Sequence, residues 1–283
     1  MSDLLNAGIK AAAYILLGMI LCYAGKRIRA LFGQWRGTDA GIVPGRNNAL
    51  ALSAGSYYLA VLLSLGGPIS WASDALWPGL GEALAFGLMA VVLLNVSMLI
   101  AEKTYLGAWE LSIGLNKGDL CSGLAEGAHY ISFGLMIMGA SWGDSGGSLV
   151  MFYFWLLGQV LLGIAVKAYF RFSPFNVPEQ VRKGNFPAAL SLDGAVIAIG
   201  NIARASLSGP FLGWVRSTLE SAGYFVFGLA ALLGARYLAD VLLFPKATFN
   251  EEIFKNAPPN QAAGILDALL LIGVSTLLGW VLG

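Results

Sequence analysis

The sequence carries little charge and few of the residues that perform chemistry in soluble enzymes. Asp, Glu, Lys and Arg make up 12% of the 283 residues and sum to a net charge of +1, about half the charged fraction of a soluble domain. Cys22 and Cys121 are the only cysteines and His129 is the only histidine, which excludes a disulfide framework and a zinc site built on spaced cysteines. With no phosphate-binding glycine loop and no basic stripe, we expect no nucleic-acid partner.

Hydrophobic residues are abundant instead. They make up 57% of the chain, and the mean hydropathy is +0.72, as in integral membrane proteins. A transmembrane helix needs about 20 apolar residues. Such windows predict an all-α polytopic membrane protein with eight spans, near residues 8–25, 49–69, 82–101, 120–141, 147–168, 187–208, 220–244 and 260–282. The basic cluster Lys26, Arg27 and Arg29 follows the first window, whereas a removable signal has basic residues before its apolar core. We therefore expect this window to remain as a helix.

Lys and Arg predict the orientation. The segments that join spans 1 to 2, 3 to 4, 5 to 6 and 7 to 8 hold most of the 17 basic residues, and positive charge is retained in the cytoplasm. Tryptophans lie near span ends on the other side, where amphipathic rings favour the membrane interface: Trp71, Trp77, Trp142, Trp214 and Trp280. We expect a multi-pass protein of the bacterial inner membrane that contacts the lipid bilayer, with both termini periplasmic or extracellular.

The sequence repeats itself internally. A shift of 141 residues places "FGLMAVVLLN" (86–95) on "FGLAALLGAR" (227–236) and "GLAEGAHYI" (123–131) on "GILDALLLI" (264–272). "NNALALSAG" also matches "NFPAALSLDG" when one residue is allowed to slip. The repeats predict two four-helix membrane units, 1–141 and 142–283. Because each unit has an even number of spans, both insert in the same direction, as parallel repeats.

Every second helix begins with a polar residue followed by small residues. The segments are "RNNALALSAG", "KGNFPAAL", "NQAAG" and, in weaker form, "KGDLCSG". The pattern resembles that of the YjfL-like bacterial inner-membrane proteins, which carry a domain of unknown function numbered 350; here two such units stand in tandem. The resemblance implies a multi-pass fold and attaches no reaction to it. The polar residues that start these helices are Asn47, Asn48, Asp119, Asn185 and Asn260.

Three acidic residues interrupt the apolar helices at one depth, where the family pattern favours small residues. Glu126, Asp193 and Asp267 lie seven or eight residues after the polar start of their helices, about 10 Å into the membrane. Ionisable groups in a span usually mark a functional site. Arg236 and Asp240 lie one turn apart in span 7, and His129 follows Glu126 by three residues. We take these six residues as a candidate pathway for a proton or small cation, in which the acids form a ring of negative charge.

Other interpretations remain open at this stage. Arg236 with Asp240 or Asp267 would also serve as a structural ion pair. No cofactor is predicted, but a metal ion bound by Glu126, His129, Asp193 and Asp267 is retained as an alternative and would make a redox or metal-dependent membrane enzyme. A third alternative is a membrane scaffold for a cytoplasmic partner, and a homo-oligomer is considered as well. The protease-like string "GDSGG" at 143–147 is interpreted as a turn, because the only histidine lies on another span.

Overall fold

The computed structural model is helical throughout the residues that it describes, which are 2–32, 42, 45–107, 111–142, 147–173, 175–243 and 248–282. A helix occupies each of the eight predicted windows, and short helices connect them. The helices are α1 (Ser2–Leu31), α3 (Asn48–Ser64), α4 (Gly66–Trp71), α5 (Leu76–Ala101) with a π-helical extension (Glu102–Leu106), α6 (Leu111–Asn116), α7 (Leu120–Ala140), α8 (Gly147–Phe172), α9 (Val177–Arg182), α10 (Phe186–Leu207), α11 (Trp214–Leu242), α12 (Phe249–Phe254) and α13 (Gln261–Leu282).

Seven of the helical segments in the described chain are long and apolar enough to cross a membrane: α1, α3 with α4, α5, α8, α10, α11 and α13. The predicted eighth span corresponds to α7, which is 21 residues long and is not among the seven. Glu126 and His129 lower its hydropathy, and both are almost completely buried. Among the seven, α10 is the most enclosed and α1 the least, because 83% of the apolar window of α10 is buried but only 17% of that of α1.

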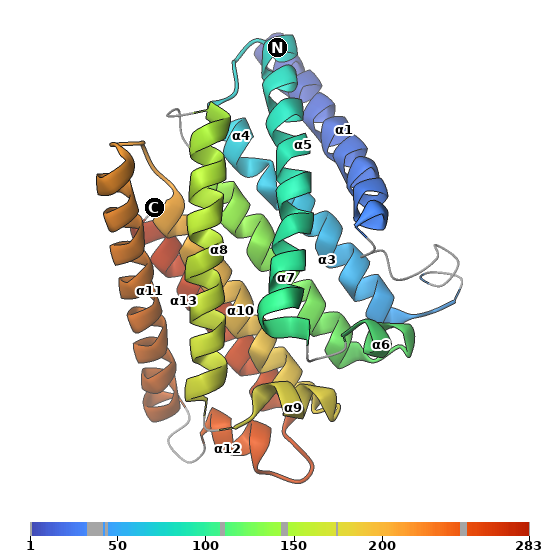
Figure 1. Ribbon diagram of the computed structural model, residues 1–283, viewed down its shortest axis with the longest axis vertical. Helices are drawn as coiled ribbons and strands as arrows, with labels where there is room; N and C mark the ends of the chain where they lie inside the picture. The colour runs from blue at the N-terminus through green and yellow to red at the C-terminus, as the bar shows by residue number, and fades with distance from the viewer. Residues whose placement is uncertain are drawn as a thin grey trace.

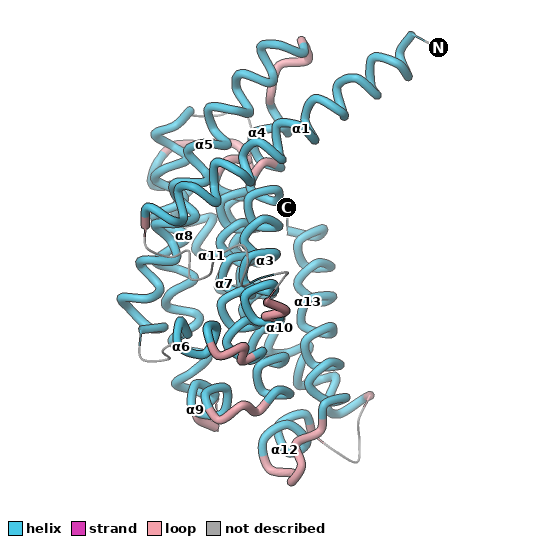
Figure 2. The backbone as a smooth tube through the Cα atoms, turned by 90° about the vertical axis from the view of Figure 1, so that its right-hand side faces the viewer, coloured by secondary structure: helices cyan, strands magenta, loops and turns pink. Residues whose placement is uncertain are grey.

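The long helices form two layers. In one layer α3, α7, α10 and α13 pack side by side in that order, and in the other α1, α5, α8 and α11 do the same (Figures 1 and 2). The layers interlock, since each inner helix of one layer touches helices of the other. The short helices α6, α9 and α12 gather at one end of the molecule, below the long helices in Figure 1.

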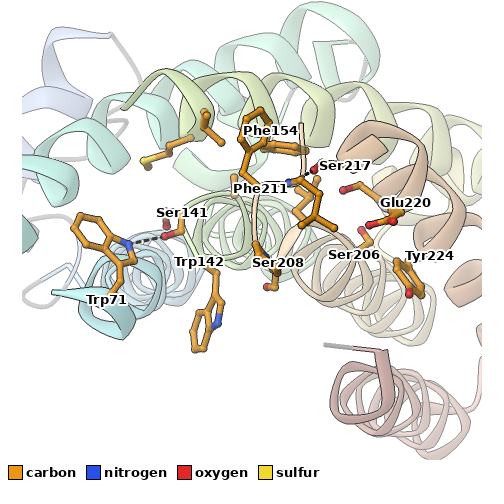
Figure 3. A pocket seen from close by; sticks show the side chains of 18 of the residues that line it. Trp71, Ser141, Trp142, Phe154, Ser206, Ser208, Phe211, Ser217, Glu220 and Tyr224 are labelled. Carbon is orange, nitrogen blue, oxygen red and sulfur yellow. Dashed lines mark hydrogen bonds between the residues drawn. The ribbon is translucent and has the colours of Figure 1, made fainter. Parts of the chain in front are cut away.

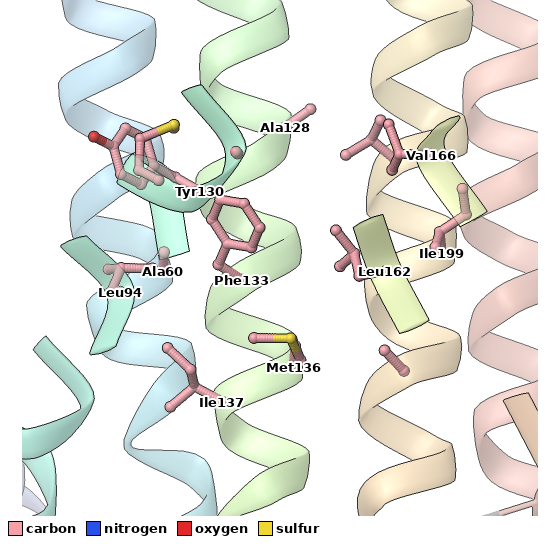
Figure 4. Packing of buried hydrophobic residues seen from close by; sticks show 14 of the residues in the cluster. Ala60, Leu94, Ala128, Tyr130, Phe133, Met136, Ile137, Leu162, Val166 and Ile199 are labelled. Atoms are coloured by element: carbon pink, nitrogen blue, oxygen red, sulfur yellow. The ribbon is translucent and has the colours of Figure 1, made fainter. Parts of the chain in front are cut away.

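Small residues bring the first layer close together. Ser132 of α7 donates a hydrogen bond to the carbonyl oxygen of Val196 on α10, at 3.0 Å. A Cβ atom built on Gly200 would lie only 2.6 Å from the Cα atom of Ser132. Such close backbone approach is the usual means by which helices associate in a membrane. Between the layers, larger side chains such as Phe133, Met136 and Leu162 fill the core (Figure 4).

Candidate functional site

The polar residues that begin alternate helices act as N-caps. The Asn47 side chain accepts a hydrogen bond from the amide of Leu50 at the start of α3, and Asn185 accepts one from Ala188 at the start of α10. Asp119 and Asn260 accept amide hydrogen bonds in the same way at the starts of α7 and α13. Asn48, by contrast, is the first residue of α3 and caps nothing that the structure describes. The caps satisfy amide groups that a helix start leaves unpaired, so they position the acids without forming the site.

The first acid, Glu126 of α7, lies in a buried ion pair. The Nη2 atom of Arg29, from α1, is 3.4 Å from Glu126 Oε2 and donates a 2.8 Å hydrogen bond to Ser53 of α3. The Ser53 hydroxyl in turn donates to the same carboxylate oxygen. The guanidinium also lies over the rings of Tyr57 and Tyr130, 5.1 and 4.7 Å from their centroids. The charge of Glu126 is therefore balanced within the first repeat.

The second acid, Asp267 of α13, is equally well paired. Arg236 of α11 binds it through two atoms, with Nε 2.8 Å from Oδ1 and Nη2 3.0 Å from Oδ2. Ser191 of α10 donates to Oδ2 at 2.5 Å. Asp267 is completely buried. Of the two ion-pair partners considered for Arg236 from the sequence, the structure has Asp267. The pairing accounts for the presence of an acid in this apolar helix.

In the two ion pairs, the acid and the serine come from equivalent positions of the repeat, but the arginine does not. Glu126 and Asp267 occupy equivalent positions of the repeat, and so do Ser53 and Ser191 in the aligned segments. Arg29, however, comes from the first helix of its unit and Arg236 from the third. The sequence analysis placed Arg29 in a loop. The signal that could have identified it is its spacing, because Leu21, Gly25 and Arg29 share one helical face and Leu21 and Arg29 are both buried.

The third acid, Asp193 of α10, has no cation beside it in the described chain. Its side chain is 8% exposed, and its buried Oδ1 atom has no hydrogen-bond partner among the described residues. It lies near Cys121 of α7, on the side of α10 that faces the first repeat. An unpartnered carboxylate in such surroundings is costly unless a proton or cation neutralises it. Asp193 is therefore the one acid of the three at this depth that no ion pair among the described residues uses.

The remaining predicted residues are dispersed. His129 lies next to the rings of Tyr105 and Phe133, with Nδ1 2.7 Å from the carbonyl oxygen of Ala125. Its buried Nε2 has no partner in the described part of the chain. Asp240 accepts the amide hydrogen of Phe249 at 2.9 Å and so helps to fix the start of α12.

The four metal-ligand candidates, Glu126, His129, Asp193 and Asp267, do not gather in one place. Across the described ranges, no group of three His, Cys, Asp or Glu side chains is arranged to hold a metal ion. The "GDSGG" string lies outside the described residues except for its final glycine.

A cavity of about 600 Å³ opens at the opposite end of the helices from α6, α9 and α12, between the two repeats. Aromatic and serine side chains line it, including Trp71, Phe154, Phe211, Ser206 and Ser208, together with the carboxylates of Glu82 and Glu220 (Figure 3). Glu82 accepts a hydrogen bond from the amide of Ser73, and Glu220 pairs with the exposed Arg216. Sequence analysis did not find this cavity, because its walls come from both repeats.

Comparison with known proteins gives two relatives. The chain is 25% identical over 215 residues to a UPF0719 transmembrane protein from Aquifex aeolicus (strain VF5), covering 75% of this chain and 78% of the relative. It is 27% identical over 97 residues to the UPF0719 transmembrane protein YshE from Bacillus subtilis (strain 168), covering 34% of this chain and 66% of that relative. No solved structure matches the chain.

The sequence profile described as Domain of Unknown Function (DUF350) matches twice, at residues 3–141 and 145–282. The two matches together cover nearly the whole chain. The resemblance inferred from the helix-start motifs is confirmed: the chain is a membrane protein that belongs to the DUF350 family, with two units in tandem.

Proposed function

We propose that the protein passes protons, or a small cation in their place, across the bacterial inner membrane and that Asp193 is the carboxylate that binds them. The observation that carries the proposal is the buried Oδ1 atom of Asp193, which no described residue contacts by a hydrogen bond. Ionisable groups with no structural partner inside a membrane usually belong to an ion or proton pathway. Glu126 and Asp267 are held by Arg29 and Arg236, so the proposed ring of three acids reduces to one working acid.

Polar groups along α10 support a route from Asp193 to the cavity. Asn201, Arg204 and Ser206 follow Asp193 toward the end of α10 that lines the cavity. Arg204 donates a 2.8 Å hydrogen bond from Nε to Asn201. A fixed positive charge on the route raises the barrier to a continuous flow of cations. We therefore favour a carrier, in which Asp193 is loaded and unloaded in separate steps, over an open channel.

The proposed topology has eight spans, with α7 crossing the membrane between α3 and α10 and with both termini periplasmic. The enclosed position of α7 supports this, because a helix shielded by its neighbours tolerates lower hydropathy than one that faces lipid. A reporter active only in the cytoplasm should therefore work when inserted after Lys183 and fail when inserted at Gly209. Activity at Gly209 alone would mean that the protein has the opposite orientation in the membrane. Activity at both sites would mean that α10 does not cross the membrane.

Proton flux into liposomes tests the proposed function. Purified protein is reconstituted with a pH-sensitive dye inside the vesicles, and a potassium diffusion potential drives proton entry. The wild-type protein should acidify the lumen, whereas Asp193→Asn, which keeps the shape of the side chain, should reduce the rate to that of empty liposomes. Asp74→Asn is the matched control, because the Asp74 side chain is fully exposed, and it should behave like the wild type. Equal flux in wild type and Asp193→Asn, or none in either, contradicts the proposal.

A membrane scaffold is the second candidate. The grouping of α6, α9 and α12 at one end of the molecule favours it, because these short helices would lie at the proposed cytoplasmic face, where a partner could reach them (Figure 1). Glu126 and Asp267 would then be structural and Asp193 incidental. The same liposome experiment separates the two candidates, since a scaffold conducts no protons.

A further inference from the structure

The contact between the two repeats joins unlike faces. Within the first layer the repeats meet where α7 packs on α10. On α7 the contact uses Ser132 and Gly139, and on α10 it uses Gly200 and Arg204. A Cβ atom on Gly139 would lie 2.7 Å from the Cα atom of Arg204, and one on Gly200 would lie 2.6 Å from that of Ser132. The last helix of unit one thus packs on the second long helix of unit two, a heterologous, head-to-tail contact.

Equivalent positions in the two units can be fixed by matching contacts. Gly123 of α7 abuts Ala49 of α3, and Gly264 of α13 abuts Pro187 of α10, in both cases with a built Cβ 2.7 Å from the neighbouring carbonyl oxygen. Positions on α7 therefore correspond to those 141 residues later on α13, and positions on α3 correspond to those 138 residues later on α10. The Ser53 and Ser191 hydrogen bonds to the two acids obey the same correspondence.

By this correspondence, the α7 surface that contacts α10 has its equivalent on α13, and the α10 surface that contacts α7 has its equivalent on α3. These two helices are the ends of the first layer. Ser132 and Gly139 of α7 correspond to Gly273 and Trp280 of α13. A Cβ atom on Gly273 would meet nothing within 4 Å, and Trp280 is 77% exposed. The ends of the layer therefore differ from its middle in lacking a neighbour.

On α3, Gly55 and Leu62 correspond to Asp193 and Gly200 of α10. Gly55 has open space above it and Leu62 is 43% exposed. A shallow groove of about 550 Å³ runs along this face of α3, lined by Asn48, Ala51, Leu52, Gly55, Ser56 and Leu59.

We propose that a second copy of this chain docks the outer face of its α13 on this groove of α3 and thereby repeats the α7–α10 contact between chains. Figure 4 shows the order of the first layer, with the blue ribbon of α3 at one side, the red ribbon of α13 at the other, and α7 and α10 between them. In a head-to-tail arrangement, the outer face of α13 in one chain is complementary to the outer face of α3 in the next chain. The occupant is therefore specified by an interface already present in the molecule, and lipid would fill the groove only in its absence.

The Bacillus subtilis relative supports the proposal. The matched 97 residues are 34% of this chain and 66% of that relative, so the relative is about half as long as this chain. A protein of that length has room for one unit, and a contact between units can then form only between separate chains. The tandem chain would make one such contact internally and another with its neighbour.

The interface between copies would differ chemically from the internal one. Asp193 is replaced by Gly55, and His129 of α7 is replaced by Leu270 of α13. The contact between chains therefore lacks an ionisable group at these two positions, and it assembles the oligomer without adding a second buried acid. Oligomer formation is thus separable from proton transfer.

Crosslinking in native membranes tests the contact. Cys22 and Cys121 are first replaced by Ala. One tagged copy then carries Leu62→Cys and a differently tagged copy carries Gly273→Cys, the pair that corresponds to Gly200 and Ser132. Oxidation should join the two tags in a covalent dimer. The control pairs Leu62→Cys with Val226→Cys on α11, a position that is also exposed, at 64%, and it should give no dimer.

A steric variant gives an independent measurement that does not need a disulfide to form. Gly55→Trp places an indole in the groove without displacing the backbone, because nothing lies within 4 Å of a Cβ there. Single-molecule photobleaching in nanodiscs should show several copies for the wild type and one copy for Gly55→Trp. Gly234→Trp, another site with open space, should remain oligomeric. A monomeric wild type overturns the proposal, as does a dimer band of equal strength in the control pair or an oligomer that survives Gly55→Trp.

Discussion

Arg29→Met should lower the free energy of unfolding by about 3–5 kcal/mol, the usual cost of leaving one member of a buried ion pair alone. Glu126 is 1% exposed and Arg29 is 2% exposed, so water cannot replace the missing partner. Ser53 would still donate a hydrogen bond to Glu126 but would leave its charge uncompensated. The measurement is reversible unfolding of the purified protein in mixed micelles, titrated with a denaturing detergent.

The double variant separates the ion pair from general damage. Glu126→Gln alone should also be costly, because it strands the guanidinium, whereas Arg29→Met with Glu126→Gln should cost less than the sum of the two single changes. Arg27→Met is the matched control. Arg27 is exposed, and its guanidinium donates to the hydroxyl of Tyr23, so water can replace what the substitution removes and little change is expected. Additive single effects would mean that Arg29 and Glu126 do not act as a pair.

Gly194→Leu should prevent stable folding, because a Cβ atom at this position would overlap the backbone of Ala268 on α13. A Cβ atom on Gly194 would already lie 2.8 Å from both the Cβ atom and the carbonyl oxygen of Ala268. The longer side chain forces α10 away from α13 and separates Ser191 of α10 from Asp267 of α13. Overpacking of this kind costs about 3 kcal/mol or more, which thermal unfolding monitored by circular dichroism would detect.

A compensating change makes the prediction specific. Gly194→Ala should be milder than Gly194→Leu, and Ala268→Gly in the same chain should recover part of the loss by restoring the space. Gly234→Leu is the control, since nothing lies within 4 Å of a Cβ at that position. If Gly194→Leu melted like Gly234→Leu, the close approach of α10 and α13 would be wrong.

The sequence predicted the helices well and their mutual contacts poorly. Hydropathy located all eight helical windows, since an apolar run of this length has few alternatives to a membrane helix. The polar helix starts were readable as well, because a cap acts on amides two or three residues away. The window 49–69 nevertheless breaks at Leu65 into α3 and α4. The signal for that break is the string Gly66-Gly67-Pro68, which hydropathy does not register although Gly and Pro disfavour a continuous helix.

The sequence predicted those site residues that stand out from their neighbours in the chain, but not the contacts they make with other helices. Asp267 was singled out because an acid within an apolar run is conspicuous, and Arg236 was recognised as a possible partner. Arg29 was not, because its partner Glu126 is 97 residues away and a basic residue at the end of a span usually extends into water. Whether Asp193 has a partner depends on the side chains that surround it from other helices, and a single sequence does not contain that information.

The different origins of the two arginines limit how the units can be exchanged. The position equivalent to Arg236 in the first unit is Asn95, and the position equivalent to Arg29 in the second unit is Tyr169, when "YILLG" (14–18) is aligned with "FWLLG" (154–158). A chimera that joins α1 and α3 of unit one to α11 and α13 of unit two would direct two arginines at one acid. The reciprocal chimera would leave its acid with none. Although the helices are repeated, their hairpins are therefore not interchangeable parts, and a functional recombinant between the units has to keep each arginine with its own acid.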